Sequence, residues 1–161
     1  MRRRTVNSRR GFTLIEAVIV ILALAISLPA TLVWLDESNQ RRVDSVNATR
    51  ATALATLVME QVLADAASKN ASLGFSALAN SATYLNTATT GLVARLSTMT
   101  SLYSGMGMTY SVTIGGLVSS SGAASGNATQ DVFRNVNVAV SYSGADGSAR
   151  TVSVQSMVTS L

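Results

Sequence analysis

The sequence contains no cysteine and no histidine, and only eight of its 161 residues are aromatic. Without cysteine, no disulfide can staple an exported domain, and without cysteine and histidine the commonest zinc ligands and nucleophile–base pairs are missing. The eight acidic residues are scattered, and neither a G-x-S-x-G motif nor a phosphate-binding glycine pattern occurs. We therefore expect a protein that is not an enzyme and that needs no cofactor and no metal.

Calcium is the metal that we considered for the acidic residues near the C-terminus. Asp131 and Asp146 flank the last predicted hairpin. Calcium takes about six to eight oxygen ligands, and two isolated carboxylates do not supply them. We interpret both aspartates as turn or surface carboxylates.

Negative charge is absent from the N-terminus, whereas positive charge is concentrated there. The formal net charge is +4, and five of the 12 basic residues lie in the first eleven positions: Arg2, Arg3, Arg4, Arg9 and Arg10. The remaining seven basic and eight acidic residues nearly balance, so the rest of the chain offers no basic patch for phosphates, and we predict no nucleic-acid binding. By the positive-inside rule, the arginines keep the N-terminus in the cytoplasm.

Residues 12–35 form one long apolar run, FTLIEAVIVILALAISLPATLVWL, with a single charge at Glu16. As a helix, these 24 residues span about 36 Å, enough to cross a hydrocarbon core of about 30 Å. The run predicts a single transmembrane helix that contacts lipid. A carboxylate inside such a helix is disfavoured unless it has a partner or lies near the membrane surface.

The string Arg9-Arg10-Gly11-Phe12-Thr13-Leu14-Ile15-Glu16 resembles the type IV prepilin processing signal of type IV pilins and type II secretion pseudopilins. The resemblance implies that a prepilin peptidase cuts between Gly11 and Phe12 and N-methylates the new amine of Phe12. It also implies that Glu16 neutralises the Phe12 amine of an adjacent subunit during filament assembly, since a compensated buried charge costs less than an unpaired one.

The same resemblance implies the partners and the location. The partners are prepilin peptidase, other pilin or pseudopilin subunits bound through the N-terminal helix, and an inner-membrane assembly platform. The protein waits in the bacterial inner membrane, with residues 36–161 outside the cytoplasm, and then enters a periplasmic or cell-surface filament. The looser pattern Ala-x-x-Leu-Ala-x-x-Val at Ala51–Val58 resembles minor pilins and minor pseudopilins, so we expect a minor subunit.

Three other interpretations remain open at the level of sequence. A major pilin has the same signal, although many pilins close a C-terminal loop with a disulfide that this chain cannot form. The apolar run at 12–35 is also consistent with an uncleaved single-pass membrane anchor that carries an extracytoplasmic binding or adhesion domain. An ordinary secretory signal peptide is disfavoured, because its apolar core is shorter and Leu28-Pro29-Ala30 is a poor cleavage site.

The chain is expected to be organised along one N-terminal helix. Residues 1–11 form the cleaved leader, 12–35 the transmembrane or filament-core helix, and 36–67 its amphipathic second half. Pro29 predicts a kink, because it cannot donate to the Ala25 carbonyl. A narrow stripe of apolar residues predicts which face of residues 36–67 is buried. The stripe consists of Ala51, Leu54, Ala55, Val58, Val62 and Ala66.

The rest of the chain predicts an antiparallel sheet after a connecting segment. Residues 68–107 connect the helix to the sheet, with possible short helices at 74–79 and 92–99. Within 108–161, alternation predicts strands at 108–114 and 132–142 and a return strand around Val152–Val158, whereas 115–130 predicts a flexible loop. The expected fold class is therefore α+β and pilin-like: a long helical spine packed on a small antiparallel sheet.

Overall fold

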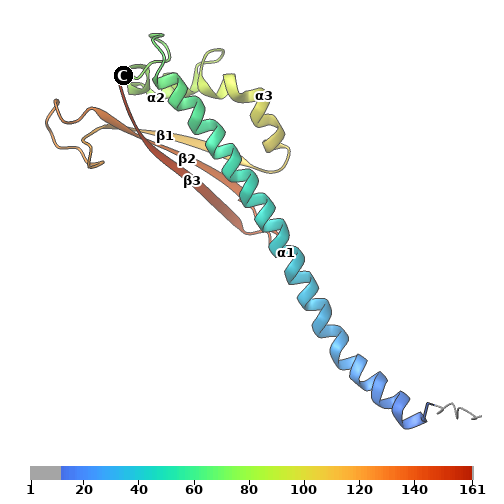
Figure 1. Ribbon diagram of the computed structural model, residues 1–161. Helices are drawn as coiled ribbons and strands as arrows, with labels where there is room; N and C mark the ends of the chain where they lie inside the picture. The colour runs from blue at the N-terminus through green and yellow to red at the C-terminus, as the bar shows by residue number, and fades with distance from the viewer. Residues whose placement is uncertain (1–11, 161) are drawn as a thin grey trace, which may run out of the picture. The chain divides into compact units, whose positions relative to one another are not determined.

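The structure, a computed structural model, describes residues 12–160. In chain order its elements are helix α1 (Leu14–Ala66), the 3-10 helix η1 (Ala77–Ala79), helices α2 (Ser81–Asn86) and α3 (Leu92–Ser104), and strands β1 (Thr109–Val118), β2 (Phe133–Ser143) and β3 (Ala149–Thr159) (Figure 1). The chain divides into two compact units after Arg41. We call residues 12–41 unit 1 and residues 42–160 unit 2.

α1 is long because the sequence offers nothing to end it. No glycine occurs between Phe12 and Leu73, and the only proline is Pro29. After Ala66, the amides of Ala67 and Ser68 close the last turn by donating to the carbonyls of Leu63 and Asp65. The polar residues that follow have no apolar stripe to continue the helix. The predicted long N-terminal helix is thereby confirmed.

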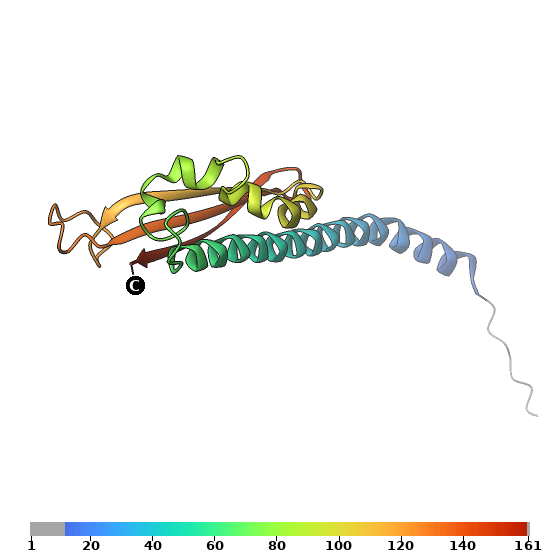
Figure 2. The ribbon, with the colours of Figure 1, turned by 90° about the horizontal axis from the view of Figure 1, so that it is seen from above.

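The three strands form one antiparallel sheet in the order β1-β2-β3. Figure 2 shows them side by side, with the loop between β1 and β2 extending beyond one end of the sheet. β2 and β3 are joined by a tight turn in which the Gly144 amide donates to the Ser148 carbonyl at 2.8 Å and Gly147 has a φ of +77°. Only glycine adopts that φ without strain, so the Asp146-Gly147 pair makes this turn possible.

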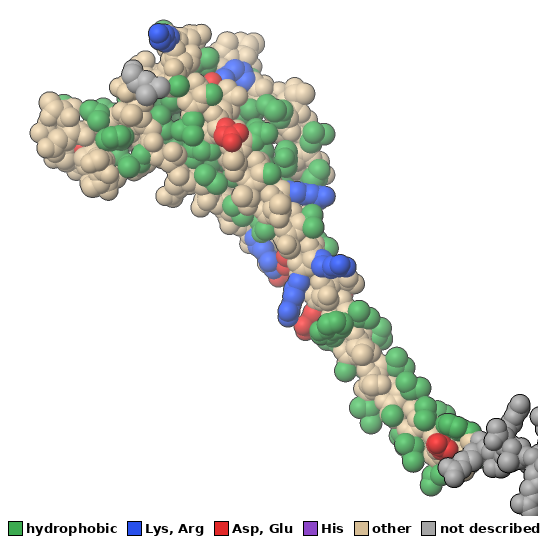
Figure 3. All heavy atoms as spheres, viewed as in Figure 1, with side chains coloured by type: hydrophobic (Ala, Val, Ile, Leu, Met, Phe, Trp, Pro, Cys, Tyr) green, Lys and Arg blue, Asp and Glu red, His purple; other side chains and the backbone are tan. Residues whose placement is uncertain are grey.

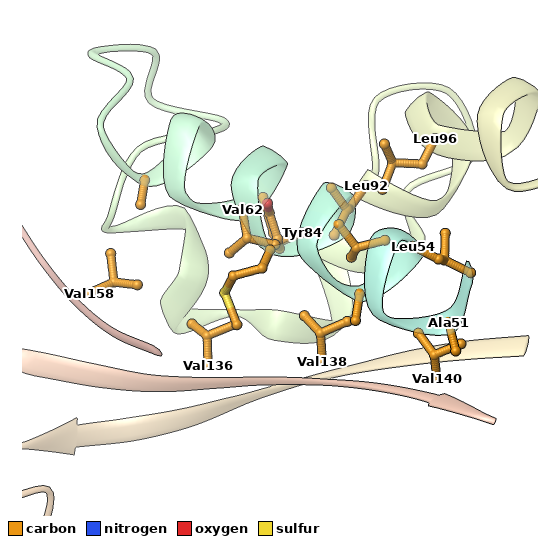
Figure 4. Packing of buried hydrophobic residues seen from close by; sticks show 14 of the residues in the cluster. Ala51, Leu54, Val62, Tyr84, Leu92, Leu96, Val136, Val138, Val140 and Val158 are labelled. Carbon is orange, nitrogen blue, oxygen red and sulfur yellow. The ribbon is translucent and has the colours of Figure 1, made fainter. Parts of the chain in front are cut away.

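The core of unit 2 lies between β2 and the C-terminal part of α1. Alternate valines of β2, Val136, Val138 and Val140, are buried and point toward α1 in Figure 4. All six residues of the predicted stripe are buried, and Met59 and Asp65 join them on the same helix. The small alanines at 51 and 55 let the helix approach the sheet closely. The α+β fold class with a pilin-like order of elements is confirmed.

The short elements differ from the sequence prediction. The predicted helix at 74–79 is only the single turn η1, α3 continues past Met99 to Ser104, and α2 was not predicted. The loop prediction for 115–130 is wrong at its start, because β1 runs on to Val118. The register shifts between Ile114 and Leu117, and this bulge at Gly115-Gly116 lets the strand continue.

Candidate functional site

The candidate site predicted by the sequence lies at the start of α1, in unit 1. Phe12 is the first described residue, with 69% of its surface exposed, and α1 begins two positions later. Gly11 and the five leader arginines, Arg2, Arg3, Arg4, Arg9 and Arg10, lie outside the described residues. The structure therefore places Phe12 two positions before α1 and Glu16 on the first turn of α1.

Thr13 and Glu16 cap this helix reciprocally. The Glu16 amide donates to Thr13 Oγ1 at 3.3 Å, and the Thr13 amide donates to Glu16 Oε2 at 3.5 Å. This is the S/T-x-x-E capping box, which gives the Thr13 amide a partner and adds a side-chain acceptor for the Glu16 amide, which also donates to the Thr13 carbonyl at 3.1 Å. The carboxylate also lies at the positive end of the helix dipole, where negative charge is favoured. Glu16 therefore has a stabilising local role in the single chain.

Glu16 remains available for a further partner. Its side chain is exposed, and within residues 12–160 no basic side chain pairs with it. The Thr13 amide occupies only one of its oxygens. Since an ionised carboxylate has about four lone-pair sites, it can accept additional hydrogen bonds from a cation while the cap stays in place.

Beyond Glu16, unit 1 is apolar on every side as far as Leu35. One described helix, α1, has an apolar stretch long enough to span a membrane, and no residue of that stretch is buried in the single chain. Figure 3 shows hydrophobic side chains along this part of α1, followed by a group of charged side chains. In the sequence, the apolar run is followed by the charged residues Asp36, Glu37, Arg41 and Arg42. A helix that is apolar all round needs lipid or other helices around it.

The hydroxyl groups within the apolar part of α1, those of Ser27 and Thr31, are satisfied by the helix's own backbone. Thr31 Oγ1 donates to the carbonyls of Ser27 and Leu28 at 3.0 and 2.8 Å, and Ser27 Oγ donates to the Leu24 carbonyl at 3.4 Å. They therefore need no other partner inside a membrane or a helix bundle. α1 is assigned as helix through Pro29, and the kink there stays a prediction.

A second polar centre lies in unit 2 and was not predicted from the sequence. The Asp65 carboxylate is 3% exposed and accepts from Tyr84 Oη at 2.6 Å and from Gln61 Nε2 at 3.0 Å. Arg95 binds the same carboxylate through both terminal nitrogens, with Nη1 at 2.9 Å from Oδ1 and Nη2 on Oδ2. We call these four side chains the Asp65 cluster. It ties α1 to α2 and α3.

The Asp65 cluster holds its charges by hydrogen bonding. Burial alone would raise the pKa of Asp65, but the hydrogen bonds from Arg95, Tyr84 and Gln61 outweigh burial and leave that pKa lowered. Burial and the hydrogen bond to Asp65 raise the pKa of Tyr84, and the same carboxylate raises the pKa of Arg95. The cluster thus contains a stable ion pair and a neutral phenol. It has no group poised near neutral pH for acid–base catalysis.

Asp131 and Asp146 organise loops. Asp131 accepts from the amides of Ser125 and Gly126 and from the Ser125 hydroxyl, and these hydrogen bonds lower its pKa. Asp146 accepts from the Ser148 amide and hydroxyl, which lowers its pKa as well. Both aspartates are turn carboxylates, as predicted. Within residues 12–160, no three acidic side chains gather as a metal site would require.

Comparison with known protein families matches the N-terminal part of the chain. Residues 6–28 match the family model described as the prokaryotic N-terminal methylation motif. The matched range contains Gly11, Phe12 and Glu16, together with most of the exposed apolar part of α1. Neither the curated proteins nor the solved structures give a match. The motif agrees with the resemblance drawn from residues 9–16.

Proposed function

Since the chain is a type IV pilin-like protein, we propose that it is a structural subunit of a type IV pilus or of a type II secretion-like filament. The observation that carries the proposal is the methylation motif at residues 6–28, which includes Glu16. Its support in the structure is that Glu16 lies on the capped first turn of an exposed apolar helix. A membrane-embedded precursor and a bundled filament helix both need such a surface.

The first step in this function is processing by prepilin peptidase between Gly11 and Phe12. Cleavage removes the five leader arginines and creates a cationic amine at Phe12, which the enzyme then methylates. Methylation leaves the amine able to carry its charge. The new ammonium group would lie at Phe12, two positions before α1 begins, and the exposed carboxylate of Glu16 lies on the first turn of that helix.

The second step is assembly through unit 1. Two unit charges 4 Å apart attract by about 1 kcal/mol in bulk water and by about 4 kcal/mol at an effective dielectric constant of 20. As α1 helices bundle and exclude water, Glu16 of one subunit therefore gains by meeting the Phe12 amine of its neighbour. The exposed apolar side chains around it supply the packing, and the capping box keeps the carboxylate at the helix start.

The partners and the location follow from these two steps. The precursor waits in the inner membrane with its arginine-rich end in the cytoplasm and unit 2 outside, and an assembly platform extracts it into the filament. We assign it as a minor subunit, because the Ala/Leu/Val pattern of α1 and the valine-rich hairpin of β2 and β3 resemble those of minor pilins and pseudopilins. Low abundance in sheared filaments, measured on a protein gel, supports the minor assignment, and dominance there contradicts it.

Replacing Glu16 tests the proposal directly. In cells that make the filament, we expect Glu16→Ala to insert into the membrane and to be cleaved normally. Its amount in sheared filaments should fall at least tenfold, which corresponds to a loss of about 1.4 kcal/mol in the free energy of assembly. The matched control is Glu37→Ala, since Glu37 is an exposed carboxylate on the same helix, paired only with Arg41. Immunoblots of membranes and of sheared filaments give both quantities. Wild-type incorporation of Glu16→Ala would remove the proposed charge pairing.

A further inference from the structure

Strand β3 is an edge of the sheet and has none of the features that usually protect an edge. Natural proteins shorten edge strands, place charges, prolines or bulges in them, or cover them. β3 has 11 residues without proline or glycine, and it pairs with β2 in unbroken register. Its one charged residue, Arg150, lies next to the turn and is paired with Asp44 and Asp146. Among the described residues, the backbone of β3 bonds to that of no strand but β2 (Figure 1).

The opposite edge of the sheet, β1, is protected. The bulge at Gly115-Gly116 interrupts its register with β2, and η1 and α2 lie against it. The chain thus protects one edge and leaves the other open over its full length. A long, regular and open edge is a surface to which another strand adds.

The turn between β2 and β3 shows which amides of β3 are free. The Gly144 amide donates to the Ser148 carbonyl, so these two opposed residues form a hydrogen-bonded pair. In an antiparallel ladder, hydrogen-bonded and non-hydrogen-bonded pairs alternate. Because the register from Ser148 onward is unbroken, the backbone groups of even-numbered residues bond to β2 and those of odd-numbered residues point outward. The outward amides at the centre of β3 are those of Thr151, Ser153, Gln155 and Met157.

The side chains of β3 show what kind of strand fits beside it. Val152 and Val154 pack against the core but stay half-buried, because β3 is the last strand on that side. Thr151, Ser153 and Gln155 alternate with them and are exposed and uncharged. An added strand with apolar side chains on the valine face would cover these valines, and this burial would stabilise the complex.

We propose that the open edge of β3 binds an extended segment of a different protein, with valine-like side chains at alternate positions and small uncharged side chains between them. β2 shows that β3 accepts this pattern, because residues 135–143 place valines toward α1 and uncharged side chains on the other face. Outward amides and carbonyls of β3 supply the hydrogen bonds, and the valines supply the apolar contact.

A second copy of this chain fits the edge less well. Antiparallel pairing of β3 with β3 has two-fold symmetry about an axis perpendicular to the sheet, so α1 of the second copy would run in the opposite direction. Copies anchored in one membrane by the proposed N-terminal helix share one direction. This step alone depends on the proposed function. The open edge itself is a property of unit 2.

Hydrogen-exchange NMR on the full chain in micelles tests the proposal. The probe is the acetylated and amidated peptide NVNVAVSYS, which has the sequence of residues 135–143. Its control has proline in place of the second and third valines, since proline cannot donate to a ladder. In the free chain, the amides of Ser153 and Gln155 should exchange faster than those of Val152 and Val154. At about ten times its Kd, the probe leaves about one chain in eleven free and should slow the exchange of Ser153 and Gln155 about tenfold.

Two variants locate the binding at this edge. Ser153→Pro removes one outward donor, and proline is accepted on the solvent side of an edge strand, so the Tm should stay near that of the wild type while probe binding is lost. Ser153→Thr keeps the amide and should bind the probe as the wild type does. If Ser153→Pro does not fold, the exchange rates of the wild type decide alone.

Any one of four results overturns the proposal. The outward amides exchange as slowly as those of the valines in the free chain, the probe leaves their exchange unchanged, or the proline peptide slows it equally. The fourth result is protection that rises with chain concentration in the absence of the probe, which would assign the edge to a second copy. None of these results bears on the incorporation of Glu16→Ala, so the two proposals fail separately.

Discussion

At the scale of single residues, Asp65 determines how the helices of unit 2 are joined. Its carboxylate comes from α1, whereas Tyr84 and Arg95, which bind it, come from α2 and α3. Asp65 is almost fully buried, and Arg95 keeps about a quarter of its side chain exposed. Removing the charge of Asp65 therefore releases an arginine that can reach water, whereas removing Arg95 would leave a buried charge uncompensated.

We predict that Asp65→Asn lowers the free energy of unfolding of unit 2 by about 1.5–3 kcal/mol, the usual value of hydrogen bonds to a charged group. Urea unfolding of the full chain in micelles measures this, followed by the near-ultraviolet circular dichroism of the tyrosines, all four of which lie in unit 2. Glu60→Gln is the control, because Glu60 is exposed on the same helix, and it should change the value by less than about 0.5 kcal/mol. Equal stability of Asp65→Asn and the wild type would show that the cluster contributes nothing.

The same residue predicts a dependence on pH. Because the folded chain lowers the pKa of Asp65, the folded state favours the carboxylate more than the unfolded chain does. This contribution is complete above the unfolded pKa of about 3.9 and is lost as the pH falls from there through the folded pKa. The difference between wild type and Asp65→Asn, measured in the same unfolding experiment, should thus narrow below about pH 4. If the difference in the free energy of unfolding between the wild type and Asp65→Asn stays constant between neutral and acid pH, the predicted pH dependence is wrong.

Sequence could identify Glu16 but not Asp65, for a physical reason. Glu16 is the only charge in a long apolar run, so its environment can be read from its neighbours. Asp65 stands between two alanines, and its partners Tyr84 and Arg95 are 19 and 30 positions away. Only folding brings them together. In the sequence, nothing distinguishes Arg95 from other basic residues, because the segment around it has no strong periodicity.

At the scale of elements, the start of α1 is set by the capping box of Thr13 and Glu16. We predict that Thr13→Ala increases the amide exchange rate of Glu16 about 5- to 30-fold, since a lost N-cap costs about 1–2 kcal/mol. Amides beyond Val20 should not change, because fraying stays within the first turns. Hydrogen-exchange NMR of the full chain in micelles provides the measurement.

Two variants sharpen this test. Thr13→Ser keeps the hydroxyl and should restore slow exchange at Glu16. Thr31→Ala removes a hydroxyl that donates to the Ser27 and Leu28 carbonyls, more than two helical turns from Glu16. It should leave the amide exchange rate of Glu16 unchanged. An unchanged Glu16 amide in Thr13→Ala would show that the side-chain cap does not stabilise the helix start.

Elements with a strong period were predictable, and short ones were not. The stripe of α1 and the alternating valines of β2 and β3 repeat over several turns or residue pairs, so their buried faces were identified. α2 has six residues, too few for a period, and depends on Asn80, whose side chain accepts from the Thr83 amide, and on the Tyr84–Asp65 hydrogen bond. The end of β1 was missed because Gly115-Gly116 has the composition of a loop but forms a bulge.

At the scale of the whole molecule, the two units differ in whether their apolar side chains are buried. Unit 2 buries its apolar stripe and strand faces in one core, whereas the described part of unit 1 leaves its large hydrophobic side chains exposed. In water, a single chain would expose this apolar surface to solvent. The stability of the folded chain therefore depends on lipid or on neighbouring helices that cover the surface. If the proposed cleavage removes the leader, the remaining basic and acidic side chains nearly balance, which would lower the electrostatic repulsion between packed copies.

The central claim is that the chain is cut after Gly11 and that the new terminus enters a helix bundle. Intact-mass spectrometry of the protein extracted from membranes and from sheared filaments tests it most directly. The account predicts a chain that begins at Phe12, carries one added methyl group on its terminal amine, and occurs in both fractions. A chain that retains residues 1–11 and stays in the membrane fraction would contradict the account and support an uncleaved anchor.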